Sequence, residues 1–104
     1  MTTDDSNSAM TGTQIEIACV CDDIKELLLY KNQQYGDSAL NPSRIFSKAS
    51  AVEQLLVRID DKLNRIKKGA GLVGTDEDVI QDLIGYLVLL KISLKHQKDE
   101  TNEL

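Results

Sequence analysis

Apolar residues recur three and four positions apart in three stretches of this chain, and no stretch alternates apolar and polar residues as a β-strand does. The stretches begin near Thr13, Ser50 and Asp76, and the only proline and most of the glycines lie between them. This pattern predicts an all-α fold, a small bundle of three main helices. A domain of 104 residues has a limited core, so we expect oligomerisation, as a dimer or tetramer, to complete it.

Local signals mark the ends of these helices. We expect the first helix to end at Gly36, because glycine readily adopts the backbone conformation that follows a helix. Ser50 and Glu53 have the spacing of a capping box and mark the start of the second helix. Thr75 is the expected N-cap of the third helix, which runs to about His96. The second half of the third helix is apolar on nearly every side, so it should be the most buried element.

Composition divides the chain into one domain and two tails. Residues 1–12 and 98–104 are polar, and we expect a disordered N-terminal tail and a frayed C-terminal tail around a single domain at 13–97. Residues 37–49 contain the only proline and predict a long loop, with room for a short helix near residues 44–46. A loop of this length is often functional, although a simple connector explains it equally well.

Charge and hydropathy exclude several classes of protein. The net charge is −5 and the chain has no tryptophan, which argues against a protein that grips a nucleic-acid backbone. The longest apolar stretch, 83–94, is interrupted by Lys91 and is too short to cross a membrane. Cys19 and Cys21 are two apart on an expected helix, so we read them as buried, reduced core thiols. These observations predict a cytoplasmic protein with no membrane and no nucleic-acid partner.

Carboxylates are the most informative candidates for chemistry. Glu53, Asp60 and Asp61 lie in the second expected helix, and Asp78 and Asp82 lie in the third. An acid within an apolar helix is costly to bury without a partner, a metal or a shifted pKa. If the two helices pack side by side, these oxygens converge with no histidine or thiolate nearby. Such an all-oxygen cluster suits Mg²⁺ or Mn²⁺.

The helical wheel ranks these acids. Glu53 and Asp60 lean towards the expected interior, whereas Asp61 points away from it and is read equally well as part of a surface salt bridge. Asp78 can be a first-turn charge that favours the helix dipole. Asp82 lies beyond that turn, at the start of the apolar stretch, and is the strongest candidate.

Basic and aromatic residues suggest how a phosphorylated ligand would be held. Charge-assisted contacts to phosphate oxygens are strong, and Lys31, Arg58 and Lys62 are candidates for them. Tyr35 and Tyr86 could stack on a base, although core tyrosines with the hydroxyl at the rim are equally compatible with the sequence.

Three segments together resemble a known family: YKNQQYGDSALNPSRIFS, VRIDDKLNRIKKG and TDEDVIQDLIGYLVLL. They are similar to the phage and bacterial nucleotide modification-associated domain of the MazG-like, all-α NTP pyrophosphatase superfamily. The resemblance covers about residues 27–95. It implies a helical bundle completed by assembly of several copies, in the bacterial or host cytoplasm. It also implies Mg²⁺-dependent hydrolysis of a nucleoside triphosphate, or a modified nucleotide, to the monophosphate and pyrophosphate.

The resemblance also implies roles for the acids. Asp60 and Asp82 would be the first metal ligands, Asp78 and Glu53 the next, and Asp61 a ligand or the group that orients the attacking water. The spacing departs from the family, which carries a Glu-x-x-Glu pair and a Glu-x-x-Asp pair on successive helices. Here Asp60 and Asp61 are adjacent, and Asp78 and Asp82 are four apart.

Two other functions fit the same sequence. A non-catalytic protein that sequesters a nucleotide or a cyclic nucleotide signal, in the manner of a sponge, needs the basic residues and the pocket but not the carboxylates. A helical interaction module needs neither, because its acids would only pair with Arg58, Lys62 and Arg65 across helices.

Overall fold

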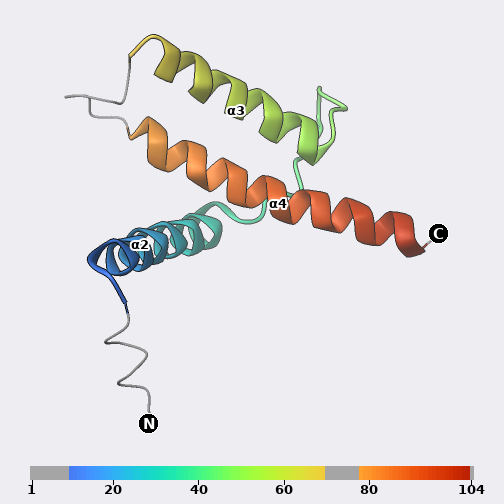
Figure 1. Ribbon diagram of the computed structural model, residues 1–104. Helices are drawn as coiled ribbons and strands as arrows, with labels where there is room; N and C mark the ends of the chain where they lie inside the picture. The colour runs from blue at the N-terminus through green and yellow to red at the C-terminus, as the bar shows by residue number, and fades with distance from the viewer. Residues whose placement is uncertain (1–9, 70–77, 104) are drawn as a thin grey trace.

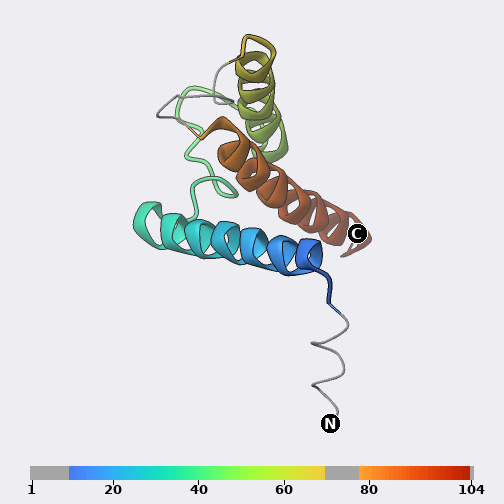
Figure 2. The ribbon, with the colours of Figure 1, turned by 60° about the vertical axis from the view of Figure 1, so that its left-hand side comes forward.

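The computed structural model describes residues 10–69 and 78–103, and these residues form three helices and no strand. The helices are α2 (Gly12–Tyr35), α3 (Ala51–Lys67) and α4 (Val79–Glu103). α3 and α4 lie side by side and run in opposite directions, and α2 crosses α4 on another side (Figures 1 and 2). The expected all-α fold of three main helices is confirmed. None of the described helices carries an apolar run long enough to cross a bilayer.

The first helix has a defined start and stop. Thr11 and Gln14 form a capping box, in which the Gln14 amide N–H donates to the Thr11 hydroxyl (3.2 Å) and the Thr11 N–H donates to the Gln14 side chain (2.9 Å). The helix therefore begins at Gly12, one residue before the expected domain start. It ends before Gly36, whose φ of 71° is accessible to glycine. The expected stop at Gly36 is confirmed.

The second helix begins where its sequence predicts. The Ser50 hydroxyl accepts a hydrogen bond from the Glu53 N–H at 3.1 Å, which satisfies one of the free donors of the first turn. The Gln54 side chain also donates to the Ala49 carbonyl at 2.9 Å. These bonds fix the direction in which the chain enters α3.

The third helix begins later and ends later than expected. The Asp78 carboxylate accepts a hydrogen bond from the Gln81 N–H at 2.7 Å, so Asp78 acts as the N-cap. Asp82 therefore lies in the first turn of α4, and the expectation that it lies beyond that turn is wrong. The expected cap, Thr75, lies outside the described residues. At the other end α4 continues to Glu103 and does not stop near His96. Much of the expected C-terminal tail is therefore helical.

The loop after α2 is organised at its start. The backbone amides of Leu40 and Asn41 donate to the Asp37 carbonyl, at 3.2 and 2.9 Å. The side-chain amides of Asn32 and Asn41 donate to the Asp37 carboxylate, at 3.2 and 2.6 Å. No helix forms at residues 44–46, where Arg44 has a φ of 56°. The chain turns at Asp37, not at the expected short helix.

Among the described residues, the buried apolar side chains lie mainly between α3 and α4. The buried apolar residues are Ile24, Ala51, Leu55, Ile59 and Val79. The expectation that the second half of α4 is the most buried element is wrong: four of its apolar side chains are exposed, namely Leu87, Val88, Ile92 and Leu94. Two other helices cannot surround a helix that is apolar on nearly every side.

Other expectations of burial also fail in the single chain. Cys19 and Cys21 are exposed free thiols, not core residues. Leu56 and Leu63 of α3, which continue the three-and-four apolar spacing of this helix, are exposed as well. Periodicity identifies the apolar face of a helix, but it does not say whether another helix covers that face.

Candidate functional site

All three helices contribute a charged side chain to one cluster. Asp82 of α4 places its Oδ2 3.2 Å from the Nζ of Lys62 on α3 and its Oδ1 3.8 Å from the Nζ of Lys31 on α2. The exposed fraction of the side chain is 11% for Lys62, 26% for Asp82 and 48% for Lys31. Exposure to solvent therefore increases across the cluster, from Lys62 through Asp82 to Lys31.

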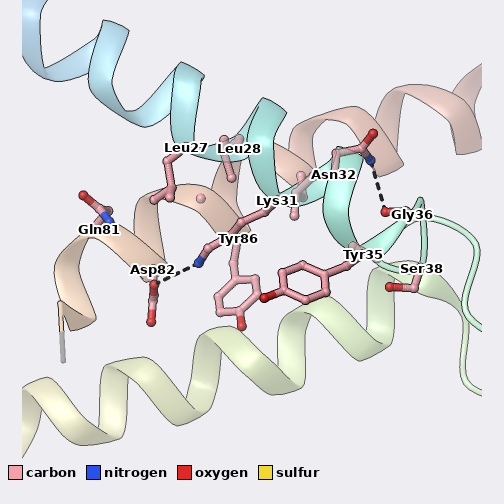
Figure 3. Close-up of a pocket in the computed structure, with 13 residues that line it drawn as sticks. Leu27, Leu28, Lys31, Asn32, Tyr35, Gly36, Ser38, Gln81, Asp82 and Tyr86 are labelled. Atoms are coloured by element: carbon pink, nitrogen blue, oxygen red, sulfur yellow. Dashed lines mark hydrogen bonds and ion pairs between the residues drawn. The ribbon is translucent and has the colours of Figure 1, made fainter.

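A pocket of about 210 Å³ opens beside this cluster, between α2 and α4 (Figure 3). Lys31, Asp82 and the rings of Tyr35 and Tyr86 line it, and Lys31 reaches towards Asp82. Tyr35 is largely exposed, whereas Tyr86 is half-buried. The pocket thus combines two aromatic faces with an ammonium group and a carboxylate.

The floor of the pocket is apolar. Leu27 and Leu28 of α2 and Leu89 of α4 contribute to it, together with Gly85. A Cβ atom at position 85 would lie 3.0 Å from Cδ2 of Leu28. Glycine at this position therefore lets α2 approach α4 closely at the pocket.

Amide groups and the turn after α2 complete the wall. Asn32 and Gln81 line the pocket, as do Gly36, Ser38 and Ala39. The Asn32 side chain is oriented by hydrogen bonds to the Gly36 carbonyl (3.4 Å) and the Asp37 carboxylate (3.2 Å). The same bonds hold the turn against the C-terminal end of α2.

Arg58 approaches Tyr86 from α3. Its guanidinium carbon lies 5.9 Å from the centroid of the Tyr86 ring, within the range of a cation–π interaction. Arg58 does not line the pocket itself, but it holds one of the rings that does. Lys62 likewise does not line the pocket, but it forms an ion pair with Asp82, which does.

The other predicted acids lie elsewhere. Glu53, Asp60, Asp61 and Asp78 are exposed and do not line the pocket, so the expectation that Glu53 and Asp60 face the interior is wrong. Asp61 pairs with Arg65 at 3.2 Å in an exposed i, i+4 salt bridge, which is the alternative that its sequence position allowed. Asp78 caps α4.

No metal cluster forms among the residues that the structure describes. Nowhere in these ranges do three or more histidine, cysteine, aspartate or glutamate side chains group closely enough to hold a metal ion. All five predicted acids belong to the described residues. The expected convergence of their oxygens is therefore wrong for a single copy of the chain.

The sequence reasoning missed Asn32, Gln81 and Gly85. Each lies three positions from a predicted site residue: Asn32 precedes Tyr35, Gln81 follows Asp78 and Gly85 follows Asp82. Extending the three-and-four spacing from those candidates along each helix would have identified them.

Comparisons of the chain with protein-family models, with curated proteins and with solved structures found no match. The MazG-like family therefore remains a prediction from the sequence motifs.

Proposed function

We propose that this protein binds a phosphorylated nucleotide in the pocket between α2 and α4, without hydrolysing it in the single-chain form. The observation that carries the proposal is the joint presence of Lys31 and two tyrosines around one pocket, with Lys62 directly behind Asp82. A nucleotide carries an anionic phosphate and a flat base, and this pocket offers groups suited to both.

The phosphate would bind at the lysine end. Ammonium groups make strong charge-assisted hydrogen bonds to phosphate oxygens. Lys31 is half-exposed and accessible from the pocket, and Lys62 is close to the same position through Asp82. Binding at this end is local, so it is compatible with a chain whose net charge is −5.

The base would bind at the tyrosine end. Stacking of a base on an aromatic side chain contributes roughly 1–3 kcal/mol. Tyr35 and Tyr86 both line the pocket, and the Arg58 guanidinium steadies the Tyr86 ring from outside. Asn32 also lines this part of the pocket, with its amide nitrogen already bonded to the Gly36 carbonyl and the Asp37 carboxylate, whereas Gln81 lies at the Asp82 end (Figure 3).

The pocket is small for such a ligand. Sites for small molecules usually measure roughly 300–1,000 Å³, and this one measures about 210 Å³. Part of the ligand would extend beyond the pocket, where a second copy of the chain could cover it. We therefore propose a homo-oligomer, and the exposed apolar side chains of α2 and α4 support it. The free thiols suit a cytoplasmic location.

Mg²⁺-dependent hydrolysis of a nucleoside triphosphate is the second candidate. The supporting observation is that Asp82, the strongest predicted ligand, lines the pocket where a triphosphate would bind. The residues described in one chain do not fit a metal site, so the other acids would have to come from a second copy.

One set of measurements tests both candidates. Purified protein is titrated with nucleoside mono-, di- and triphosphates and with cyclic nucleotides, in EDTA and in Mg²⁺, and binding is followed by calorimetry and products by chromatography. The binding proposal predicts saturable binding in EDTA that weakens in Lys31→Ala. Lys25, six residues earlier on α2, is exposed and does not line this pocket, so Lys25→Ala should bind like the wild type. Absence of binding in EDTA together with pyrophosphate release in Mg²⁺ would favour the hydrolase.

A further inference from the structure

Asp82 is already ion-paired with the two ammonium groups, of Lys31 and Lys62, that a phosphate would contact. Each of its carboxylate oxygens faces a different ammonium group, Oδ1 that of Lys31 and Oδ2 that of Lys62. A phosphate placed on Lys31 and Lys62 would contact the same nitrogen atoms and lie against a carboxylate of the same sign. The two anions therefore compete for the same ammonium groups, and their like charges repel each other.

The burial of Lys62 makes the competition unavoidable. Its side chain is only 11% exposed and is absent from the pocket lining, whereas Asp82 lines the pocket. A ligand that enters from the pocket therefore meets Asp82 before Lys62. It reaches the Lys62 ammonium only if the Asp82 side chain moves.

We propose that Asp82 is an internal counter-ion, which an incoming phosphate must displace from Lys31 and Lys62. This inference rests on the proposed function and concerns the same pocket. In the free protein Asp82 offsets part of the positive charge of the two lysines and pairs with the buried Lys62. In the bound protein the phosphate takes over that role, and Asp82 turns to the solvent side of the pocket.

The exchange selects among anions. A ligand carboxylate brings the same charge as Asp82 and gains nothing by replacing it. A terminal phosphate monoester carries a charge of roughly −1.5 to −2 and three acceptor oxygens, so it competes better. A cyclic phosphodiester carries a single negative charge on its phosphate. The inferred ligand class is therefore a nucleotide with a terminal phosphate.

Inorganic pyrophosphate is the simplest probe of this exchange. Its affinity is measured by calorimetry in EDTA for the wild type, Asp82→Asn and Asp61→Asn. Removing the competing carboxylate should tighten binding by about tenfold, as expected for one charge-assisted contact. Asp61→Asn makes the same change in net charge at an exposed salt bridge on α3 and should stay within about twofold of the wild type, because exposed pairs have small effects.

Several outcomes would overturn the inference. They are equal or weaker binding by Asp82→Asn, an equal gain in Asp61→Asn, and no pyrophosphate binding in any of the three proteins. A metal-ligand role for Asp82 would give the opposite sign, a loss on substitution measured in Mg²⁺. If pyrophosphate binds as expected but no nucleotide binds more tightly than pyrophosphate, the nucleotide proposal fails and the counter-ion exchange stands.

A measurement on the wild type guards against misfolding of Asp82→Asn. Carbon-13 NMR follows the aspartate carboxyl signals during a pyrophosphate titration, with the Asp82 signal assigned by its absence from the Asp82→Glu spectrum. Displacement predicts that this signal moves towards that of a solvent-exposed aspartate as binding saturates, while Asp61 stays unchanged. An Asp82 signal that keeps its ligand-free position while pyrophosphate binds refutes the exchange.

Discussion

The ammonium group of Lys62 lies 3.2 Å from Oδ2 of Asp82 although the Lys62 side chain is almost fully buried. Lys62 follows Leu55 and Ile59 on the face of α3 that packs against α4. A lysine in this position is costly unless an acid meets it. The pair therefore links the packing of α3 and α4 to the chemistry of the pocket.

Removing the Lys62 charge should destabilise the fold. In Lys62→Met the partly buried Asp82 carboxylate loses its closest cation, and we expect the free energy of unfolding to fall by about 1–3 kcal/mol. Urea denaturation followed by circular dichroism measures this change. Lys25→Met removes a lysine whose partner Asp22 is mostly exposed, and it should change stability by less than about 0.5 kcal/mol. Equal effects of the two substitutions would show that burial of the pair is irrelevant.

Filling the space at Gly85 should close the pocket. Gly85 is buried where α2 and α4 approach, and a Cβ there already lies 3.0 Å from Cδ2 of Leu28. In Gly85→Leu the longer side chain must push Leu28 aside or enter the pocket, so nucleotide binding should be lost while far-ultraviolet circular dichroism still reports helices. Gly85→Ala requires only a small movement of a flexible leucine side chain and should keep most of the affinity. Full binding by Gly85→Leu would place the ligand elsewhere.

Gly36 should be sensitive to any side chain. Its backbone lies at φ 71° and ψ −162°, a region that is essentially restricted to glycine. We expect Gly36→Ala to cost about 1–3 kcal/mol in the free energy of unfolding and to weaken ligand binding, because Gly36 lines the pocket. Gly12→Ala is the control, since a Cβ at Gly12 meets nothing within 4 Å. The prediction fails if urea denaturation gives the two variants the same stability.

Local signals made the helices predictable. The Gly36 stop and the Ser50 cap depend on residues within one turn of the helix end, and both appear where the sequence places them. Asp78 was recognised as a first-turn acid, but its role as the cap was not, because Thr75 offered an alternative.

The site depends on contacts between helices, and these were only partly predictable. Lys31, Tyr35, Asp82 and Tyr86 were identified by residue type, and they do meet at one pocket. Asp82 meets a lysine of α3 and not the acids of α3, because α3 turns the face that carries Lys62 towards α4. A helical wheel for one helix does not contain this rotation.

The exposed apolar surface gives the last prediction. Val20 and Leu29 of α2 are 54% and 64% exposed and line an apolar groove between α2 and α4, which Leu28, Val88 and Ile92 also line. Burying one such side chain stabilises an interface by roughly 1.5–3 kcal/mol, and in a symmetric dimer each residue contributes twice. If a second copy covers this groove, Val20→Lys and Leu29→Lys should each shift the protein towards the monomer in sedimentation-velocity experiments. Glu26→Lys, an exposed change on the same helix outside the groove, should leave the assembly intact. A wild-type protein that sediments as a monomer at high concentration, or Lys variants that assemble normally, would exclude this groove as the interface.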